Sequence, residues 1–206
     1  MSFQWIIDNA ESISMERKKV VASTTSRNGV VRSVGRGAQP WRFEVKLPDG
    51  PRWTDIRSYI SQAEALDRLT AANIQLNASG QASWLSKYQG NSANYTGFVA
   101  TITQNSSTIT LTTSPTTSSG YKFRAGDFIQ LGASGKVYTV AADVAYNSNT
   151  VTLHRPVIEA SASGVALNVA DNCVWSVTCT QFPTWTIFAR DQVSWSGPFV
   201  FSEVIS

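Results

Sequence analysis

The sequence is poor in the residues that build metal sites and disulfide frameworks. Its 206 residues hold one histidine, His154, and two cysteines, Cys173 and Cys179. A structural zinc site needs four ligands, mostly Cys and His, so this composition makes such a site very improbable. In an extended strand, positions 173 and 179 would lie about 20 Å apart on the same face. This spacing predicts two reduced thiols.

Long apolar runs are also missing. No stretch is long and apolar enough to cross a bilayer. The first residues, Met1 to Trp5, lack the basic and apolar regions of a secretory signal. Apolar residues make up 42% of the chain and charged residues only 15%, a balance typical of a folded chain and not of a disordered one. We therefore expect a globular protein without a membrane partner.

No pattern of residues typical of an active site is found. No serine or cysteine near His154 has motif context, so a His-based triad is unsupported. The carboxylates are scattered and show no glycosidase pair. Gly35-Arg36-Gly37 lacks the strand–turn–helix context of a phosphate loop. We expect a protein that is not an enzyme, with no catalytic residues, no metal and no cofactor.

A basic hairpin is the most informative segment that the chain does contain. Asn28-Gly29 separates two β-branched runs, which is the strongest short-range hairpin signal. Both arms mix Val with Thr, Ser and Arg, so neither is apolar enough to be a buried core strand. The edges of such a hairpin stay exposed unless another chain pairs with them, and a solvated hairpin is the alternative. The candidate subunit-interface residues are Val20, Val21, Arg27, Val30, Val31, Arg32 and Arg36.

Positive charge is concentrated in the same part of the chain. Residues 1–88 hold 12 lysines and arginines against 8 carboxylates, whereas residues 89–178 hold 4 of each. Three explanations stay open: a nucleic-acid face, protection of strand edges, or pairing with an acidic neighbour.

Periodic patterns predict a sheet and one helix in the first segment. Strict alternation over residues 39–47 predicts a half-buried strand with Trp41, Phe43, Val45 and Leu47 on its inner face. Residues 3–7 are predicted to form a short strand. Apolar residues at helical spacing from Ile56 to Leu69 predict a helix that covers the sheet, with Thr54 as its cap and Asp55 in its first turn.

The composition changes at residues 90–94 and becomes rich in Thr, Ser and Val as far as residue 178. The predicted strands cover residues 97–103, 108–113, 128–131, 136–140, 150–153 and 174–178. Five or six short strands fit a small closed or nearly closed β-barrel, with an OB-like barrel as the natural candidate. Such a barrel can bind single-stranded nucleic acid or saccharide on its exposed face, although its aromatic residues can equally belong to the core or rim. The candidate ligand-face residues are Tyr121, Phe123, Lys136 and Tyr138.

Aromatic strands return near the C-terminus, at residues 182–188 and 192–201. The N-terminal segment alone would make a thin core, and these strands would complete its sheet. The predicted fold is therefore mainly β with one helix. It has a discontinuous domain, residues 1–88 and 180–206, and an inserted OB-like β-barrel, residues 92–178.

The order of these segments resembles the distal tail proteins of long, flexible-tailed bacteriophages (siphophages), in the form with an OB-fold insertion that is found in phages of Gram-negative hosts. The resemblance depends on the strand at residues 39–45 and on the stretch from Ala125-Gly126-Asp127 to Leu131, which the strand at residues 136–140 follows.

The resemblance implies a structural virion protein. Distal tail proteins form a hexameric ring that joins the tail tube to the tail tip or baseplate. Their first domain is a tail-tube-like β-sandwich or split barrel packed by a helix, and the inserted barrel points outward. The implied partners are copies of the chain itself, the tail-tube protein, the tail-tip or hub proteins and a host surface saccharide, with DNA only as cargo in the channel. The implied location is the phage tail tip, after synthesis in the host cytoplasm.

An outward barrel predicts that removal of residues 90–178 leaves a folded, ring-competent remainder. The alternative function is an OB-fold binding module for single-stranded nucleic acid or a host saccharide.

Overall fold

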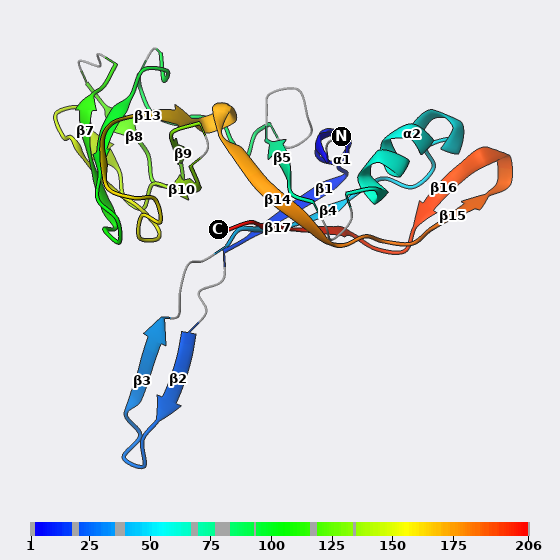
Figure 1. The fold of residues 1–206 in the computed structure, drawn as a ribbon, viewed down its shortest axis with the longest axis horizontal. Helices are drawn as coiled ribbons and strands as arrows, with labels where there is room; N and C mark the ends of the chain where they lie inside the picture. The colour runs from blue at the N-terminus through cyan, green and yellow to red at the C-terminus, as the bar shows by residue number, and fades with distance from the viewer. Residues whose placement is uncertain are drawn as a thin grey trace.

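The structure, a computed structural model, describes residues 3–17, 21–35, 40–66, 70–76, 83–92, 94–115, 119–133 and 135–205. It is mainly β with few helices, as predicted from the sequence. Figure 1 shows two larger groups of strands, one toward each half of the molecule, and two hairpins that extend away from them.

Both ends of the chain contribute to the first sheet. Its antiparallel order is β1-β4-β17-β14-β5. The strands are β1 (Ser12–Glu16), β4 (Arg42–Lys46), β5 (Ala72–Gln75), β14 (Val174–Gln181) and β17 (Phe199–Glu203). In β4, Phe43 lies opposite Met15 of β1 and Phe201 of β17. The predicted alternation is confirmed, because Trp41, Phe43, Val45 and Leu47 are all buried.

The position of β14 corrects one prediction. Residues 174–178 were expected to form a strand of the inserted barrel. They instead begin β14, which pairs with β17 on one side and β5 on the other. The Thr/Ser/Val-rich composition does not change until after this strand, so composition alone placed the segment with the wrong sheet.

The segment predicted as an N-terminal strand is a helix, α1 (Gln4–Asp8). Its buried side chains, Phe3, Ile6, Ile7 and Ala10, follow helical spacing, with separations of three, four and seven residues from Phe3. The prediction was wrong because five residues are too few to separate the two periods. The protein therefore has α1 in addition to the expected helix.

The expected helix is α2 (Trp53–Glu64), with Asp55 in its first turn and Ile56, Ile60 and Ala63 buried. Thr54 is not the cap, because Arg52 occupies that position and makes no side-chain cap hydrogen bond. The helix also ends earlier than predicted; Leu66 is buried just beyond it, and Leu69 lies outside the described residues. Tyr59 is 46% exposed and stacks on Trp5, with ring centroids 5.1 Å apart.

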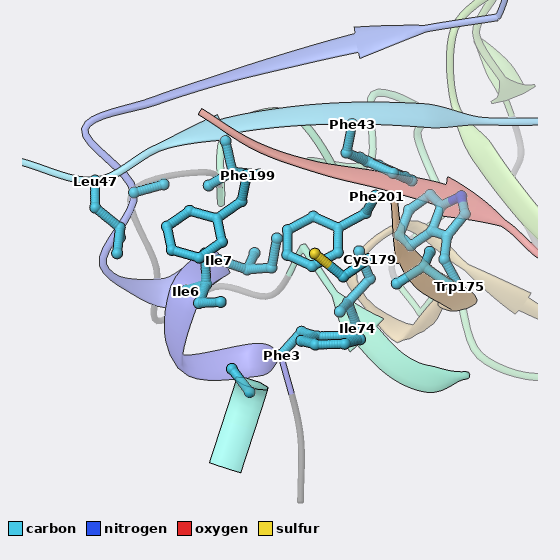
Figure 2. Close-up of a cluster of buried hydrophobic side chains, with 14 of the residues drawn as sticks. Phe3, Ile6, Ile7, Phe43, Leu47, Ile74, Trp175, Cys179, Phe199 and Phe201 are labelled. Carbon is cyan, nitrogen blue, oxygen red and sulfur yellow. The ribbon is translucent and has the colours of Figure 1, made fainter. Parts of the chain in front are cut away.

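The first core fills the space between the first sheet and the two helices. Figure 2 shows Phe3 beneath Phe201, with Ile74 and Cys179 beside them. The Phe3 and Phe201 rings lie 5.0 Å apart, and Phe43 meets Trp175 edge-on at 5.7 Å. Since residues near both termini meet here, neither end of the chain can complete this core alone.

The second sheet is built from the middle of the chain in the order β10-β9-β13-β6-β7-β12. Its strands are β6 (Val99–Ile102), β7 (Thr108–Thr113), β9 (Phe128–Leu131), β10 (Val137–Thr139), β12 (Thr150–Thr152) and β13 (Ala162–Val169). A bridge between Val140 and Leu153 links its two end strands, so the sheet curls back on itself. A separate pair, β8 (Tyr121–Phe123) and β11 (Val144–Ala145), adds to this part. A second core lies inside it, with Phe98, Ile129 and Val151 fully buried.

Two further hairpins complete the described structure. One pairs β2 (Val21–Thr25) with β3 (Val31–Gly35), and the other pairs β15 (Trp185–Phe188) with β16 (Gln192–Trp195). Short 3-10 turns, η1 (Ala170–Asn172) and η2 (Ala189–Asp191), precede β14 and β16. In Figure 1 the hairpins leave the first sheet in different directions.

The central position of Phe43 gives a stability prediction. We expect Phe43→Ala to lower the free energy of unfolding by about 3–5 kcal/mol, because it leaves a cavity among aromatic rings. The control Ile187→Ala, at a side chain 47% exposed, should change it by less than about 0.5 kcal/mol. Urea denaturation followed by fluorescence measures both. Equal effects of the two substitutions would contradict this description of the core.

Candidate functional site

The β2–β3 hairpin lies where Asn28-Gly29 predicts one, and its turn runs from Ser26 to Gly29. The Ser26 amide donates to the Val30 carbonyl at 2.9 Å, and the Gly29 amide donates back to the Ser26 carbonyl at 2.9 Å. Gly29 has a φ of +76°, which glycine adopts without the steric cost that a side chain brings. Five residue pairs, from Thr25–Val31 to Val21–Gly35, form the ladder.

The tip of this hairpin exposes apolar side chains. Val30 is 55% and Val31 64% exposed, and Arg27 beside them is also exposed. Val21 lies in β2 and Arg32 in β3, and at these two positions the structure describes the backbone alone; Val20 and Arg36 lie outside the described residues. Among the described strands, β2 and β3 pair only with each other. Both outer edges are therefore available to another chain.

The two edges of the first sheet differ from each other. At the β5 edge, the side-chain amide of Gln4 donates to the Gln75 carbonyl at 2.9 Å and accepts from the Gln75 amide at 2.8 Å. Gln4 thus occupies the backbone groups of Gln75, which a neighbouring strand would use. At the other edge, β1 has a strand partner on one side only, among the described strands.

The β15–β16 hairpin is fixed to α2 and presents an apolar tip. The Trp185 ring stacks on Trp53 at 4.2 Å. The Thr54 hydroxyl and amide both donate to the Asp191 carboxylate, at 2.7 and 3.2 Å. Ile187 and Phe188 are nevertheless 47% and 48% exposed. A hairpin that is held in place and keeps apolar side chains in water is typical of a contact surface.

The four candidate ligand-face residues do not form one face, which corrects that prediction. Phe123 and Tyr138 are fully buried in the second core. The Tyr138 hydroxyl donates to Glu159 at 2.6 Å, and burial raises the pKa of this phenol well above its ordinary value. Tyr121 is half-buried beneath the Arg124 guanidinium, and the Lys136 amine donates to the Val204 carbonyl at 2.8 Å. Alternation cannot tell a barrel's inner face from its outer face, so the sequence could not separate these roles.

All the basic side chains of residues 89–178 have partners within the chain. The Lys122 amine donates to Asn149 at 2.7 Å, and Arg124 pairs with Asp143 at 2.7 Å. Lys136 is bonded to Val204, and Arg155 to Glu203. A face that binds nucleic acid needs cations directed toward phosphates, and these four are directed toward the protein.

The pair Arg155–Glu203 lies at the junction of the two sheets. The two side chains are only 1% and 2% exposed, and they form two parallel hydrogen bonds of 2.8 and 2.9 Å. Arg155 also donates to the Val137 carbonyl at 3.0 Å, and the Trp41 indole donates to the same oxygen at 2.9 Å. The Trp41 amide donates to Glu203 at 3.2 Å. A buried charge is tolerated only with such pairing.

Other contacts strengthen this junction. The Gln130 side chain donates to the Val174 carbonyl at 2.9 Å and accepts from the Val174 amide at 3.1 Å, so it joins β9 to β14. Phe128 and Val137, from the second sheet, are buried in the first core. Phe128 meets Trp175 edge-on at 5.4 Å. The part built from the middle of the chain is therefore packed against the first sheet.

This junction changes the expected effect of deleting residues 90–178. The deletion removes the first half of β14, and it leaves Glu203 without Arg155. We therefore no longer expect that deletion product to fold.

Within the described residues, no cluster of three or more His, Cys, Asp or Glu residues could hold a metal ion. None of the described helices has the length and hydropathy needed to cross a bilayer. His154 accepts a hydrogen bond from the Thr139 amide at 2.9 Å and lies 5.3 Å from the Trp41 ring. It therefore takes part in closing the curled sheet.

No protein-family model matches this chain, and no curated protein matches its sequence.

The buried ion pair gives a prediction for three variants. We expect Arg155→Met to lower the free energy of unfolding by about 3–5 kcal/mol, because it leaves the Glu203 carboxylate buried without its cation. The double variant Arg155→Met/Glu203→Gln should lose less, since glutamine is neutral and can still accept from Trp41. The exposed control Lys46→Met, which breaks the Lys46–Glu11 pair, should cost under about 1 kcal/mol. Thermal unfolding measures all three, and a double variant that loses as much stability as Arg155→Met, or more, would contradict the coupling.

The cysteines give a chemical prediction. Cys173 and Cys179 are both buried, and burial raises the pKa of the Cys173 thiol well above its ordinary value. The thiolate is the reactive form, so neither residue should be alkylated by iodoacetamide in the native protein at pH 8. Both should react in urea. Mass spectrometry counts the adducts, and rapid native labelling would contradict the burial.

Proposed function

We propose that this chain is a structural, ring-forming distal tail protein of a siphophage. Six copies would form a ring between the tail tube and the tail tip or baseplate, with DNA passing through the channel as cargo. The curled central sheet would be the outward OB-like barrel, and the sheet made by the two chain ends would be the tail-tube-like domain.

The observation that carries the proposal is the β2–β3 hairpin. It extends from the first sheet with two open edges and two exposed valines, Val30 and Val31. An exposed edge of this kind favours aggregation unless a partner covers it. In a ring, each copy has an identical neighbour in the same position, and this neighbour would cover the exposed edge of the hairpin.

The unequal edges of the first sheet support a head-to-tail contact. If β1 edges paired with each other, the result would be a twofold dimer, because identical patches make a closed isologous contact. A contact between different patches, such as the hairpin of one copy and the β1 edge of the next, generates a ring when the rotation closes. The blocked β5 edge leaves β1 as the open border of this sheet among the described strands.

The single-strand nucleic-acid alternative has less support. The four basic side chains of residues 89–178 are bonded within the chain, and Phe123 and Tyr138 are buried. Neither a cationic groove nor stacking platforms remain at the positions considered for such binding.

Mass measurement in solution at millimolar protein, together with negative-stain imaging, tests the assembly. We expect a hollow sixfold particle with six times the 22.4 kDa mass of one chain. The double variant Val30→Asp/Val31→Asp should stay monomeric, because burying two carboxylates in the contact is strongly unfavourable.

The matched control is Thr110→Asp. Thr110 is an exposed β-branched residue on β7, in the curled sheet, and its variant should form the same particle as the unaltered chain. A twofold dimer, a solid particle, a monomer at millimolar protein, or equal effects of the two variants would contradict the proposal.

A further inference from the structure

Trp84 is the most exposed large apolar side chain among the described residues, at 70%. It lies in a turn over residues 83–86, and the two residues that follow it in the chain hold this turn in place. Leu85 packs against the first core, and the Ser86 hydroxyl donates to the Leu76 carbonyl. These anchors keep the indole in water even though its burial would be favourable.

A cavity of about 570 Å³ opens beside this indole. Its lining includes Trp84, Lys87, Tyr88, Ser92, Tyr95 and Asp171. The lining residues from Trp84 to Tyr95, which precede the curled sheet in the chain, form one wall. Asp171, in the η1 turn before β14, belongs to the other. A cavity of this size is within the range of small-molecule sites, which combine aromatic walls with a few polar groups.

The aromatic wall is formed before any ligand arrives. The Tyr88 hydroxyl donates to the Lys122 carbonyl, and its ring lies 5.1 Å from Tyr95 and 6.3 Å, edge-on, from Phe123. Gly90 makes this arrangement possible, since a Cβ there would overlap both the Tyr88 hydroxyl and the Lys122 carbonyl. A site that is already ordered loses little conformational freedom when it binds.

Polar groups converge on the same cavity. The Tyr95 hydroxyl donates to the Asp171 carboxylate at 2.8 Å, and this hydrogen bond raises the pKa of Tyr95, so the phenol stays protonated. A carboxylate can accept about four hydrogen bonds, so Asp171 can also accept from ligand hydroxyls. The exposed ammonium of Lys87 is a donor.

We propose that this cavity, the Trp84 cavity, binds a neutral saccharide. A sugar ring has an apolar C–H face, which would stack on the indole, and vicinal hydroxyls, which would bond to Asp171, Tyr95 and Lys87. Phosphate-bearing ligands fit less well because Asp171 would repel them. The proposal does not depend on ring assembly, and its residues are not those considered for a ligand face from the sequence.

The test uses the full-length chain on an array of neutral oligosaccharides, followed by titration of the strongest hit with saturation-transfer NMR. We expect at least one hit with a dissociation constant between about 10 μM and 1 mM. Trp84→Ala should weaken its binding at least tenfold, and Tyr95→Phe should weaken it by a smaller factor. The matched control Tyr146→Ala, at an aromatic residue 46% exposed, should bind as the unaltered chain does.

The opposing outcomes are distinct from those of the assembly experiment. No hit for the unaltered chain, or undiminished binding by Trp84→Ala, would overturn the saccharide site and leave the ring proposal standing. If Trp84→Ala abolished ring formation as well as binding, the residue would be a subunit contact, and the site would also be overturned. Circular dichroism checks that each variant is folded.

Discussion

The arrangement of the molecule depends on one buried ion pair. Arg155 follows β12 of the curled sheet, and Glu203 ends β17 of the first sheet. Each is the other's charge partner in a place that water does not reach. Removing either partner would leave the other charge buried without compensation, which costs several kcal/mol. Val137, whose carbonyl accepts from both Arg155 and Trp41, adds the backbone of β10 to the same group. The first sheet and the Trp84 cavity are therefore held in fixed positions relative to the curled sheet.

Two of the surfaces given functional roles, the β15–β16 hairpin and the Trp84 turn, are fixed to this frame. The β15–β16 hairpin is fixed through Asp191 and Trp185 to α2, which covers the first core. The Trp84 turn is fixed to that core through Leu85. The β2–β3 hairpin differs, because its described contacts lie mainly within itself. In the proposed ring, the fixed surfaces would set the angle between neighbours, whereas the hairpin would gain its order from the neighbour that it contacts.

The sequence was most informative where one period extended over several residues. Strand β4 was predicted with its inner face because four alternating apolar side chains define it, and residues 108–113 and 128–131 were predicted with their observed bounds. Strand β13 was missed because Gly164 and small residues weaken its pattern. Arg155 and Glu203 are 48 positions apart, and the sequence alone gives no sign that two such distant charges pair, because only the contact between the sheets brings them together. Trp84 was overlooked because an indole in a turn has no periodicity; its only signal was a large apolar residue in a polar stretch.

The hydrogen bonds between Gln4 and Gln75 have a consequence for newly made copies of this chain. A sheet with two free borders can stack onto itself without limit, which is how fibrils grow. A side-chain amide that takes the place of the next strand prevents strand addition at one border. If two β1 borders met, their backbone groups would pair with each other and leave no edge for a further copy. Larger assemblies must then use a different contact, so the number of subunits is determined by the angle of that contact and not by the supply of protein.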